Sequence, residues 1–283
     1  MKIITKIEEM QNFSIQMKRE GKKIGLVPTM GYLHDGHLSL VKIAKEKSDV
    51  AVVSIFVNPT QFGPSEDFNK YPRDEARDLE LLKSLNVDAV FMPDSNEIYQ
   101  FNYQTYVDVE EITKKQEGEF RPTHFKGVTT IVSILFNCVQ PDVAVFGQKD
   151  AQQAAVINRM VNDLKFPVKI IIAPIIREPD GLAMSSRNVY LSIQERKDAL
   201  ILYRALKYGE KLIEGKEMNP QVIIDNMRIM ISGIESARLD YIRIVNAYYF
   251  TEPDFIEGGN EYYILIACKI GKTRLIDNIL VQV

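Results

Sequence analysis

The chain of 283 residues is poor in the features that mark disulfide-rich, metal-binding and membrane proteins. Its two cysteines, Cys138 and Cys268, each lie within an apolar run, which is typical of buried thiols in a reducing compartment rather than of a disulfide or a metal site. The longest apolar stretches, such as residues 50–57, are too short to cross a bilayer. Residues 1–6 lack the apolar core of a signal peptide. These absences predict a cytoplasmic protein.

The chain also lacks an excess of charge of either sign. Lysine and arginine total 35 against 38 for aspartate and glutamate, which gives a net charge of -3. This balance provides no overall field for nucleic acid, so an acidic substrate would have to be held by local cations. The hydrophobic content of 46% and the charged content of 26% are ordinary for a globular protein with a sizeable core.

Short apolar runs alternate with helical patterns from residue 22 to about residue 176. The expected strands are 23–27, 49–57, 89–92, 143–146 and 168–176, and the expected helices are 37–47, 74–85, 128–139 and 151–164. Residues 49–57 are apolar on both faces, as expected for a central parallel strand. The alternation predicts an α/β fold, a doubly wound parallel sheet whose ligands bind at the carboxyl ends of the strands.

The pattern changes after residue 188. Helices are expected over 193–214 and 220–231, and alternating antiparallel strands over 239–245, 262–268 and 273–281. We therefore predict two domains. Residues 1–176 would form the larger domain, and residues 177–283 a smaller α+β domain that closes over the site.

Residues 30–37, with the sequence Met-Gly-Tyr-Leu-His-Asp-Gly-His, connect the first expected strand to the first expected helix. His34 and His37 are three residues apart and are expected to face the same way at the helix N-terminus. Their imidazole N–H groups and the unpaired amides of that helix end suit a polyphosphate, and Gly36 allows close approach to the backbone. In isolation, an H-x-G-H string is as often incidental as functional.

Polar residues also follow three other expected strands. Asn58 and Gln61, after the second strand, suit a small polar substrate, although Asn-Pro is more often a plain turn. Residues 147–150, Gly-Gln-Lys-Asp, bring a cation to the start of a helix, for which Asp150 would also serve as the N-cap. Residues 184–187, Met-Ser-Ser-Arg, suit a cluster of donors for phosphoryl oxygens, although on its own such a segment is more often an ordinary serine-rich turn. Residues 120–127, which include Arg121, fit either a substrate-side loop or a packed turn.

Taken together, these strings resemble the pantothenate synthetase family. The resemblance runs through residues 28–37, 56–62, 71–73, 121–127, 146–153 and 184–187, in the family's order. It implies a Rossmann-like first domain of the H-x-G-H nucleotidyl transferase superfamily. It also implies a reaction in which ATP, (R)-pantoate and β-alanine give pantothenate, AMP and pyrophosphate through a pantoyl-adenylate. Mg²⁺, a cytoplasmic location and a homodimer are further expectations from the resemblance.

The resemblance also assigns roles to individual positions. The residues expected to bind ATP are Met30, Gly31, Tyr32, Leu33, His34, Asp35, Gly36, His37, Gly147, Gln148, Lys149, Asp150, Ile176, Met184, Ser185, Ser186 and Arg187. Catalysis is expected from His37, His34, Lys149 and Arg187. The pantoate site is expected to include Gln61, Gln153, Asn58 and Arg121, with Gln61 also near β-alanine. Gln148, where relatives often carry lysine, and Tyr32, where a smaller polar residue is common, depart from the family pattern.

Two other functions stay open at this point. An H-x-G-H nucleotidyl transferase that keeps the nucleotide on its product would need further cations for a substrate phosphate, whereas the glutamine-bearing loops suit a hydroxy acid. A nucleotide-binding sensor or scaffold without catalysis would not need His37, Lys149 and Arg187 together. No protein ligand for a metal ion is predicted, because Mg²⁺ beside ATP takes mostly phosphate oxygens and water.

Overall fold

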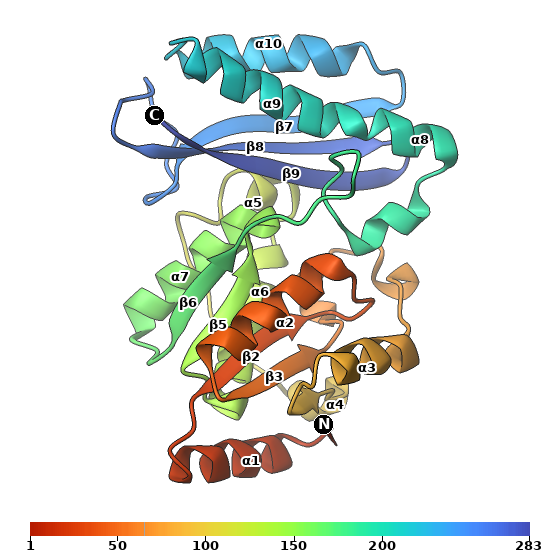
Figure 1. The fold of residues 1–283 in the computed structure, drawn as a ribbon, viewed down its shortest axis with the longest axis vertical. Coiled ribbons are helices and arrows are strands. Elements are labelled where there is room, and N and C mark those ends of the chain that lie inside the picture. Colours follow the sequence, from red (N-terminus) through yellow and green to blue (C-terminus); the bar gives the residue numbers. More distant parts are fainter. Residues whose placement is uncertain (65) are drawn as a thin grey trace. The chain divides into compact units, whose positions relative to one another are not determined.

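The computed structural model describes residues 1–64 and 66–283. The chain forms two compact units, of which the first comprises Met1–Gly147 and Val156–Pro174 and the second Gln148–Ala155 and Ile175–Val283. We describe each unit by itself (Figure 1). The division into domains of residues 1–176 and 177–283 stays a prediction, because compactness alone does not make a unit an independent domain.

Within the described residues, the first unit contains a sheet of six parallel strands in the order β1-β4-β3-β2-β5-β6. The strands are β1 (Lys2–Ile4), β2 (Ile24–Thr29), β3 (Val50–Ile55), β4 (Ala89–Phe91), β5 (Val143–Gly147) and β6 (Lys169–Ala173). The chain proceeds outward from β2 to β3 and β4, then returns to place β5 on the other side of β2. Ligands of doubly wound sheets bind at such a reversal of strand order, outside the carboxyl ends of the strands.

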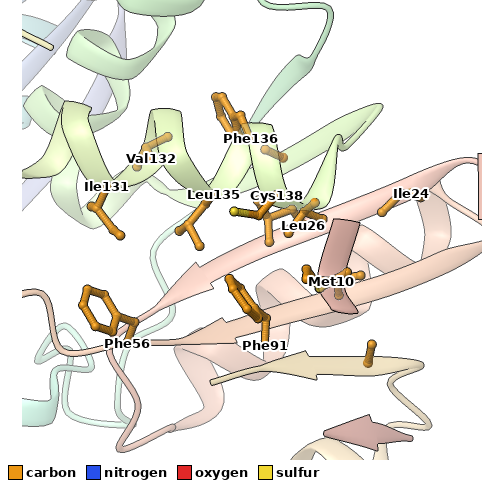
Figure 2. Packing of buried hydrophobic residues seen from close by; sticks show 14 of the residues in the cluster. Met10, Ile24, Leu26, Phe56, Phe91, Ile131, Val132, Leu135, Phe136 and Cys138 are labelled. Carbon is orange, nitrogen blue, oxygen red and sulfur yellow. The ribbon is translucent and has the colours of Figure 1, made fainter. Parts of the chain in front are cut away.

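Helices cover both faces of this sheet, because its central strands are apolar on both sides. All six residues of β3 are buried. One face buries Leu26 and Phe146 against α1 and α6, while the other buries Val27 and Val145 against α2. Figure 2 shows Phe56 and Phe91 pointing toward α6 in the first of these cores. The predicted fold class, a doubly wound parallel sheet, is confirmed.

The first unit also contains several α-helices and 3₁₀ turns. Its helices are α1 (Ile7–Arg19), α2 (Asp35–Lys47), α3 (Glu75–Ser84), α4 (Ser95–Ile98), α5 (Glu117–Phe120) and α6 (His124–Val139), with 3₁₀ turns η1 (Pro59–Gln61) and η2 (Phe68–Lys70). The turn η3 (Gln148–Asp150) and the first residues of α7 (Ala151–Leu164) group with the second unit. Across residues 1–64 and 66–283, no helix combines the length and the hydropathy needed to cross a membrane.

The second unit is a smaller α+β structure, as predicted. The antiparallel strands β7 (Ala237–Asn246), β8 (Glu261–Ile270) and β9 (Thr273–Gln282) form its sheet, and the helices are α8 (Ile193–Asp198), α9 (Leu200–Glu214) and α10 (Pro220–Ser232), after the turn η4 (Ser186–Tyr190). Isoleucines of α10, β7 and β8 pack together in one core with α9. Figure 1 shows α9 and α10 lying along one face of this sheet.

Three details differ from the sequence prediction. Strand β1 and helix α1 were not predicted, so the parallel sheet has an edge strand beyond the five expected. The helix expected over 193–214 is divided at Ala199 into α8 and α9. The strand expected over 168–176 ends at Ala173, directly before Pro174, because proline lacks the N–H that would continue the ladder.

Candidate active site

A tight turn follows β2 and leads into α2. Gly31 and Tyr32 both have positive φ, of 79° and 51°, a conformation that requires support at the non-glycine position. The buried carboxylate of Asp78, in α3, supplies it by accepting hydrogen bonds from the backbone N–H groups of Tyr32 and Leu33, both at 2.7 Å. Burial raises the pKa of Asp78, and these two bonds oppose that shift. The turn before the histidines is therefore fixed by a residue 46 positions away.

The two histidines of this segment cap α2 together. His34 is the N-cap, and its Nδ1 accepts the backbone N–H of Gly36 at 3.1 Å. The Nδ1 of His37 accepts the backbone N–H of His34 at 3.3 Å, which completes a capping box. The ring centroids are 4.1 Å apart, so the side chains lie side by side as expected. Because each Nδ1 is an acceptor, each neutral ring carries its proton on Nε2, and both rings are set up as Nε2–H donors.

The amide of Gln61, in η1, is held in one orientation. Asn58 donates through Nδ2 to Gln61 Oε1 at 3.1 Å and to the Gly127 carbonyl at 3.1 Å. The Oδ1 of Asn58 accepts from the hydroxyl of Tyr99 at 2.7 Å. Burial raises the pKa of Tyr99 to about 12, which keeps that hydroxyl a donor. With Oε1 occupied, Gln61 presents its Nε2 donor, which lies 3.2 Å from the sulfur of Met30.

Arg121 lies beside the same turn, in a dense polar cluster. Its guanidinium forms a two-pronged ion pair with Glu66, at 2.6 Å and 2.7 Å, and Nη2 also donates to the Gln61 carbonyl at 3.3 Å. His124 Nδ1 lies 2.9 Å from the same carbonyl oxygen. Because a carbonyl oxygen can only accept a hydrogen bond, the neutral ring of His124 carries its proton on Nδ1. Burial and the neighbouring Arg121 lower the pKa of His124 to about 4. Asn58 and Arg121, predicted as pantoate ligands, thus contact Gln61 in this structure.

In the second unit, η3 carries the cation expected to contact ATP. Lys149 is half-buried, and the buried side chain of Asn278 in β9 donates to the carbonyls of Gln148 and Lys149 at 2.9 Å and 3.0 Å. A Cβ added to Gly147, which ends β5, would meet no atom within 4 Å, so the backbone there is open as predicted. Gln153 is half-buried in the first turn of α7.

The Met184–Arg187 segment begins at the end of a small hairpin in the second unit. The backbone N–H of Met184 donates to the carbonyl of Ile176 at 3.0 Å, and Arg177 forms a bridge with Ala183. The N-cap of η4 is Ser185, whose hydroxyl accepts the N–H of Arg187 at 3.3 Å. Ile176 and Met184, both predicted as ATP-binding, are therefore linked by this hairpin, and Arg187 lies in the η4 turn that follows it.

Five residues that support these segments were not predicted. Asp78, Tyr99 and Asn278 are distant in sequence from the loops they hold, and Arg177 forms a buried ion pair with Asp277. Asp78 is a buried acid within an amphipathic helix, and positions 277 and 278 form a polar pair within an apolar strand. Both features break the local pattern of hydrophobic and polar residues. Such a break is the signal that would have drawn attention to them.

The family model for pantoate-beta-alanine ligase matches residues 2–280 of the chain. The chain belongs to the pantoate–β-alanine ligase family. Among its relatives is a pantothenate synthetase of Thermoanaerobacter sp. (strain X514), 55% identical over 280 residues that make up 99% of this chain and 98% of that protein. A pantothenate synthetase of Syntrophomonas wolfei subsp. wolfei is 52% identical over the full length of both chains.

Solved structures agree with this family at the level of the whole fold. The crystal structure of pantothenate synthetase from Thermus thermophilus has a TM-score of 0.93, 41% sequence identity and complete coverage of both chains. The pantoate-beta-alanine ligase of Francisella tularensis, complexed with beta-gamma ATP and beta-alanine, has a TM-score of 0.82 at 34% identity, covering 99% of this chain and 97% of that one. The resemblance drawn from the motifs is confirmed, and the protein is a ligase rather than another H-x-G-H nucleotidyl transferase or a sensor.

Proposed function

We propose that the protein joins (R)-pantoate to β-alanine in two steps that consume ATP. In the first step, a carboxylate oxygen of pantoate attacks the α-phosphorus of ATP, and pyrophosphate leaves as the pantoyl-adenylate forms. In the second, the amine of β-alanine attacks the acyl carbon, and AMP leaves as pantothenate forms. The observation that supports this most directly is the pair of histidines, His34 and His37, that cap the N-terminus of a long helix in a chain of this family.

The N-terminus of α2 is suited to the charge that develops in the first step. The helix has 13 residues, and its dipole favours an anion at this end. The Nε2–H donors of His34 and His37 would add hydrogen bonds to phosphoryl oxygens without changing protonation. Donors that are already oriented stabilise a transition state by several kcal/mol in total, of which one donor contributes about 3 kcal/mol.

Other expected ATP contacts rest on the family resemblance. The main chain of residues 30–37 and of Gly147 would line the nucleotide, together with Gln148, Asp150, Ile176, and residues 184–186. The cations Lys149 and Arg187 would neutralise phosphate charge as pyrophosphate leaves. We propose both as catalytic residues alongside the two histidines.

For the pantoate site we propose the amides of Gln61 and Gln153 as direct ligands. An amide can donate to a carboxylate and accept from a hydroxyl, and it adds no charge that would repel ATP. The fixed orientation of Gln61 supports its role as a donor, since its Oε1 already accepts from Asn58. Asn58 and Arg121 belong to this proposed site through the contacts they make with Gln61. The same Gln61 amide would lie near β-alanine in the second step.

Three further properties are proposed from the resemblance: Mg²⁺ as a companion of ATP, a homodimer, and a cytoplasmic location. Within residues 1–64 and 66–283, no group of three or more His, Cys, Asp and Glu side chains is arranged to hold a metal ion. Beside ATP, a Mg²⁺ ion would take its ligands mostly from phosphate oxygens and water. When bound, it would neutralise phosphate charge, and we propose no protein ligand for it.

Isotope exchange between pyrophosphate and ATP tests the proposed reaction. The first step is reversible, so labelled pyrophosphate should enter ATP when pantoate is present and β-alanine is absent. Addition of β-alanine should then release AMP and pantothenate in equal amounts. Exchange that is independent of pantoate, or that requires a phosphorylated substrate, would contradict the proposal and favour another nucleotidyl transferase reaction.

A further inference from the structure

Asn278 of β9 makes three hydrogen bonds to the loop that carries Lys149. Its two Nδ2 hydrogens are directed to consecutive carbonyl oxygens, of Gln148 at 2.9 Å and of Lys149 at 3.0 Å. Its Oδ1 accepts from the side chain of Gln148 at 3.1 Å. The exposed fraction of Asn278 is 1%, so water does not compete for these bonds. Two adjacent peptide carbonyls held by one rigid amide fix the backbone path of η3.

A buried ion pair orients Asn278 in turn. The guanidinium of Arg177 binds both carboxylate oxygens of Asp277, at 2.6 Å and 2.9 Å, and donates to the Asn278 carbonyl at 3.1 Å. The same carboxylate accepts the backbone N–H of Asn278 at 2.7 Å. Tyr203 of α9 stacks its ring 4.0 Å from the guanidinium carbon. The main chain of Asn278 is thus held on both its N–H and its C=O by one ion pair.

The backbone of Arg177 belongs to the hairpin that leads to the second predicted ATP segment. Arg177 pairs with Ala183, and its Nη1 donates to the carbonyl of Gly181 at 3.1 Å within the hairpin turn. Met184 follows directly and bonds to Ile176. The η3 segment and the Ile176–Met184 hairpin, which lie far apart in the sequence, are therefore connected through Arg177, Asp277 and Asn278.

We infer that Asn278, oriented by the Arg177–Asp277 ion pair, is a positioning residue for adenylate formation and acts through Lys149. This inference rests on the proposed function, in which Lys149 contacts the triphosphate. On a loose loop, the side chain of Lys149 would occupy a range of positions. Here the backbone of Lys149 is fixed, because its carbonyl accepts a hydrogen bond from Asn278. Misplacement of a catalytic group by about 1 Å can slow a reaction by about 100-fold.

Strand geometry does not require these polar residues. Asp277 pairs with Ile266 and Asn278 with Leu265, so their neighbours across the strand are apolar. Asparagine and aspartate are poor strand formers, and a buried ion pair is often no more stabilising than apolar residues of similar size. A strand selected for packing alone would carry apolar side chains at both positions. The contacts of Asn278 with η3 explain its polarity.

A double-mutant cycle between Asn278 and Lys149 tests the inference. The four proteins are the wild type, Asn278→Ala, Lys149→Ala and the double variant, and the rate constant of pantoate-dependent pyrophosphate exchange is measured for each. Ile244→Val, in the same unit and fully buried, is the matched control for general loosening of the core. Asn278→Ser keeps a single donor on a shorter side chain, and it replaces Asn278→Ala if that variant does not fold by circular dichroism.

We expect Asn278→Ala to lower the exchange rate constant about 10- to 100-fold, with the KM for pantoate changed less than about threefold. In the Lys149→Ala background the same substitution should change the rate less than about threefold, because the group it positions is gone. Equal effects in both backgrounds, or a loss no larger than that of Ile244→Val, would overturn the inference.

The proposed function and the positioning role fail in distinguishable ways. If Lys149→Ala exchanges at the wild-type rate, the assignment of Lys149 to the phosphates is wrong, and the positioning role falls with it. If Lys149→Ala is slow while Asn278→Ala is normal, the positioning role alone is wrong.

Discussion

The stability of the first unit should fall between pH 7 and pH 5 because of a single buried histidine. His124 donates from Nδ1 to the carbonyl of Gln61, and its Nε2 lies 3.3 Å from Nη1 of Arg121. A proton added at Nε2 would remove the acceptor that faces Arg121 and place two cations together. Burial and Arg121 accordingly lower the pKa of His124 to about 4 in the folded protein.

The sign and the size of the effect follow from proton linkage. The unfolded state binds a proton near the ordinary histidine pKa of about 6.5, whereas the folded state binds one only near pH 4. The unfolded state therefore holds more protons throughout this window, so stability is full above about pH 6.5 and is lost as the pH falls toward 4. At pH 5 the loss from this one group should be about 2 kcal/mol.

Urea unfolding at pH 7 and pH 5 measures the effect, with His124→Asn as the comparison. Asparagine can keep a donor toward the Gln61 carbonyl but does not titrate. The wild type should lose about 2 kcal/mol more free energy of unfolding between the two pH values than the variant does. Every other titrating group is common to both proteins and cancels. Equal pH dependence in the two proteins would mean that His124 is not held neutral by its surroundings, and the reasoning would be refuted.

Three further predictions concern the proposed site. His37→Asn should retain an acceptor for the His34 N–H, and so the cap on α2, but should slow pantoate-dependent pyrophosphate exchange about 100-fold or more, since the Nε2–H donor is lost. Gly127→Ala should destabilise the protein by about 1–3 kcal/mol in urea unfolding, because the new Cβ would lie 2.5 Å from the Thr60 carbonyl; Gly63→Ala, with its nearest neighbour at 3.8 Å, should be neutral. Gln153→Ala should weaken pantoate binding about 10- to 100-fold in calorimetry and leave ATP binding nearly unchanged, while equal weakening of both would indicate a disrupted site.

The parallel sheet could be predicted from sequence because its strands are buried on both faces. The six residues of β3 are all buried, and a short apolar run between two helical patterns is typical of such a central strand. The carboxyl ends of β2 and β5 carry the family motifs, and the topology brings these strands together. Local pattern and global fold agree here, so the pattern predicts the fold.

The first 19 residues could not be predicted in the same way, for a physical reason. Strand β1 has three residues, of which Lys2 and Ile3 are exposed and Ile4 alone is buried. Helix α1 has no side-chain cap at Lys6; instead the N–H of Ile7 donates to the carboxylate of Glu97 at 2.9 Å. The capping group comes from 90 positions away, so no local signal marks where the helix begins.

The motifs locate the site, but they do not say which of their residues would touch a substrate. Arg121 belongs to a family motif and carries a charge suited to a carboxylate. Its contacts with Glu66, with the Gln61 carbonyl and with His124 engage four of its five N–H donors, namely Nε–H, both on Nη2 and one on Nη1. A guanidinium neutralised in this way offers a pantoate carboxylate little further attraction. Its contact with the Gln61 carbonyl instead supports the turn that carries the proposed pantoate ligand. A motif can include such a supporting residue as well as a residue that contacts the substrate, and the sequence alone does not separate the two.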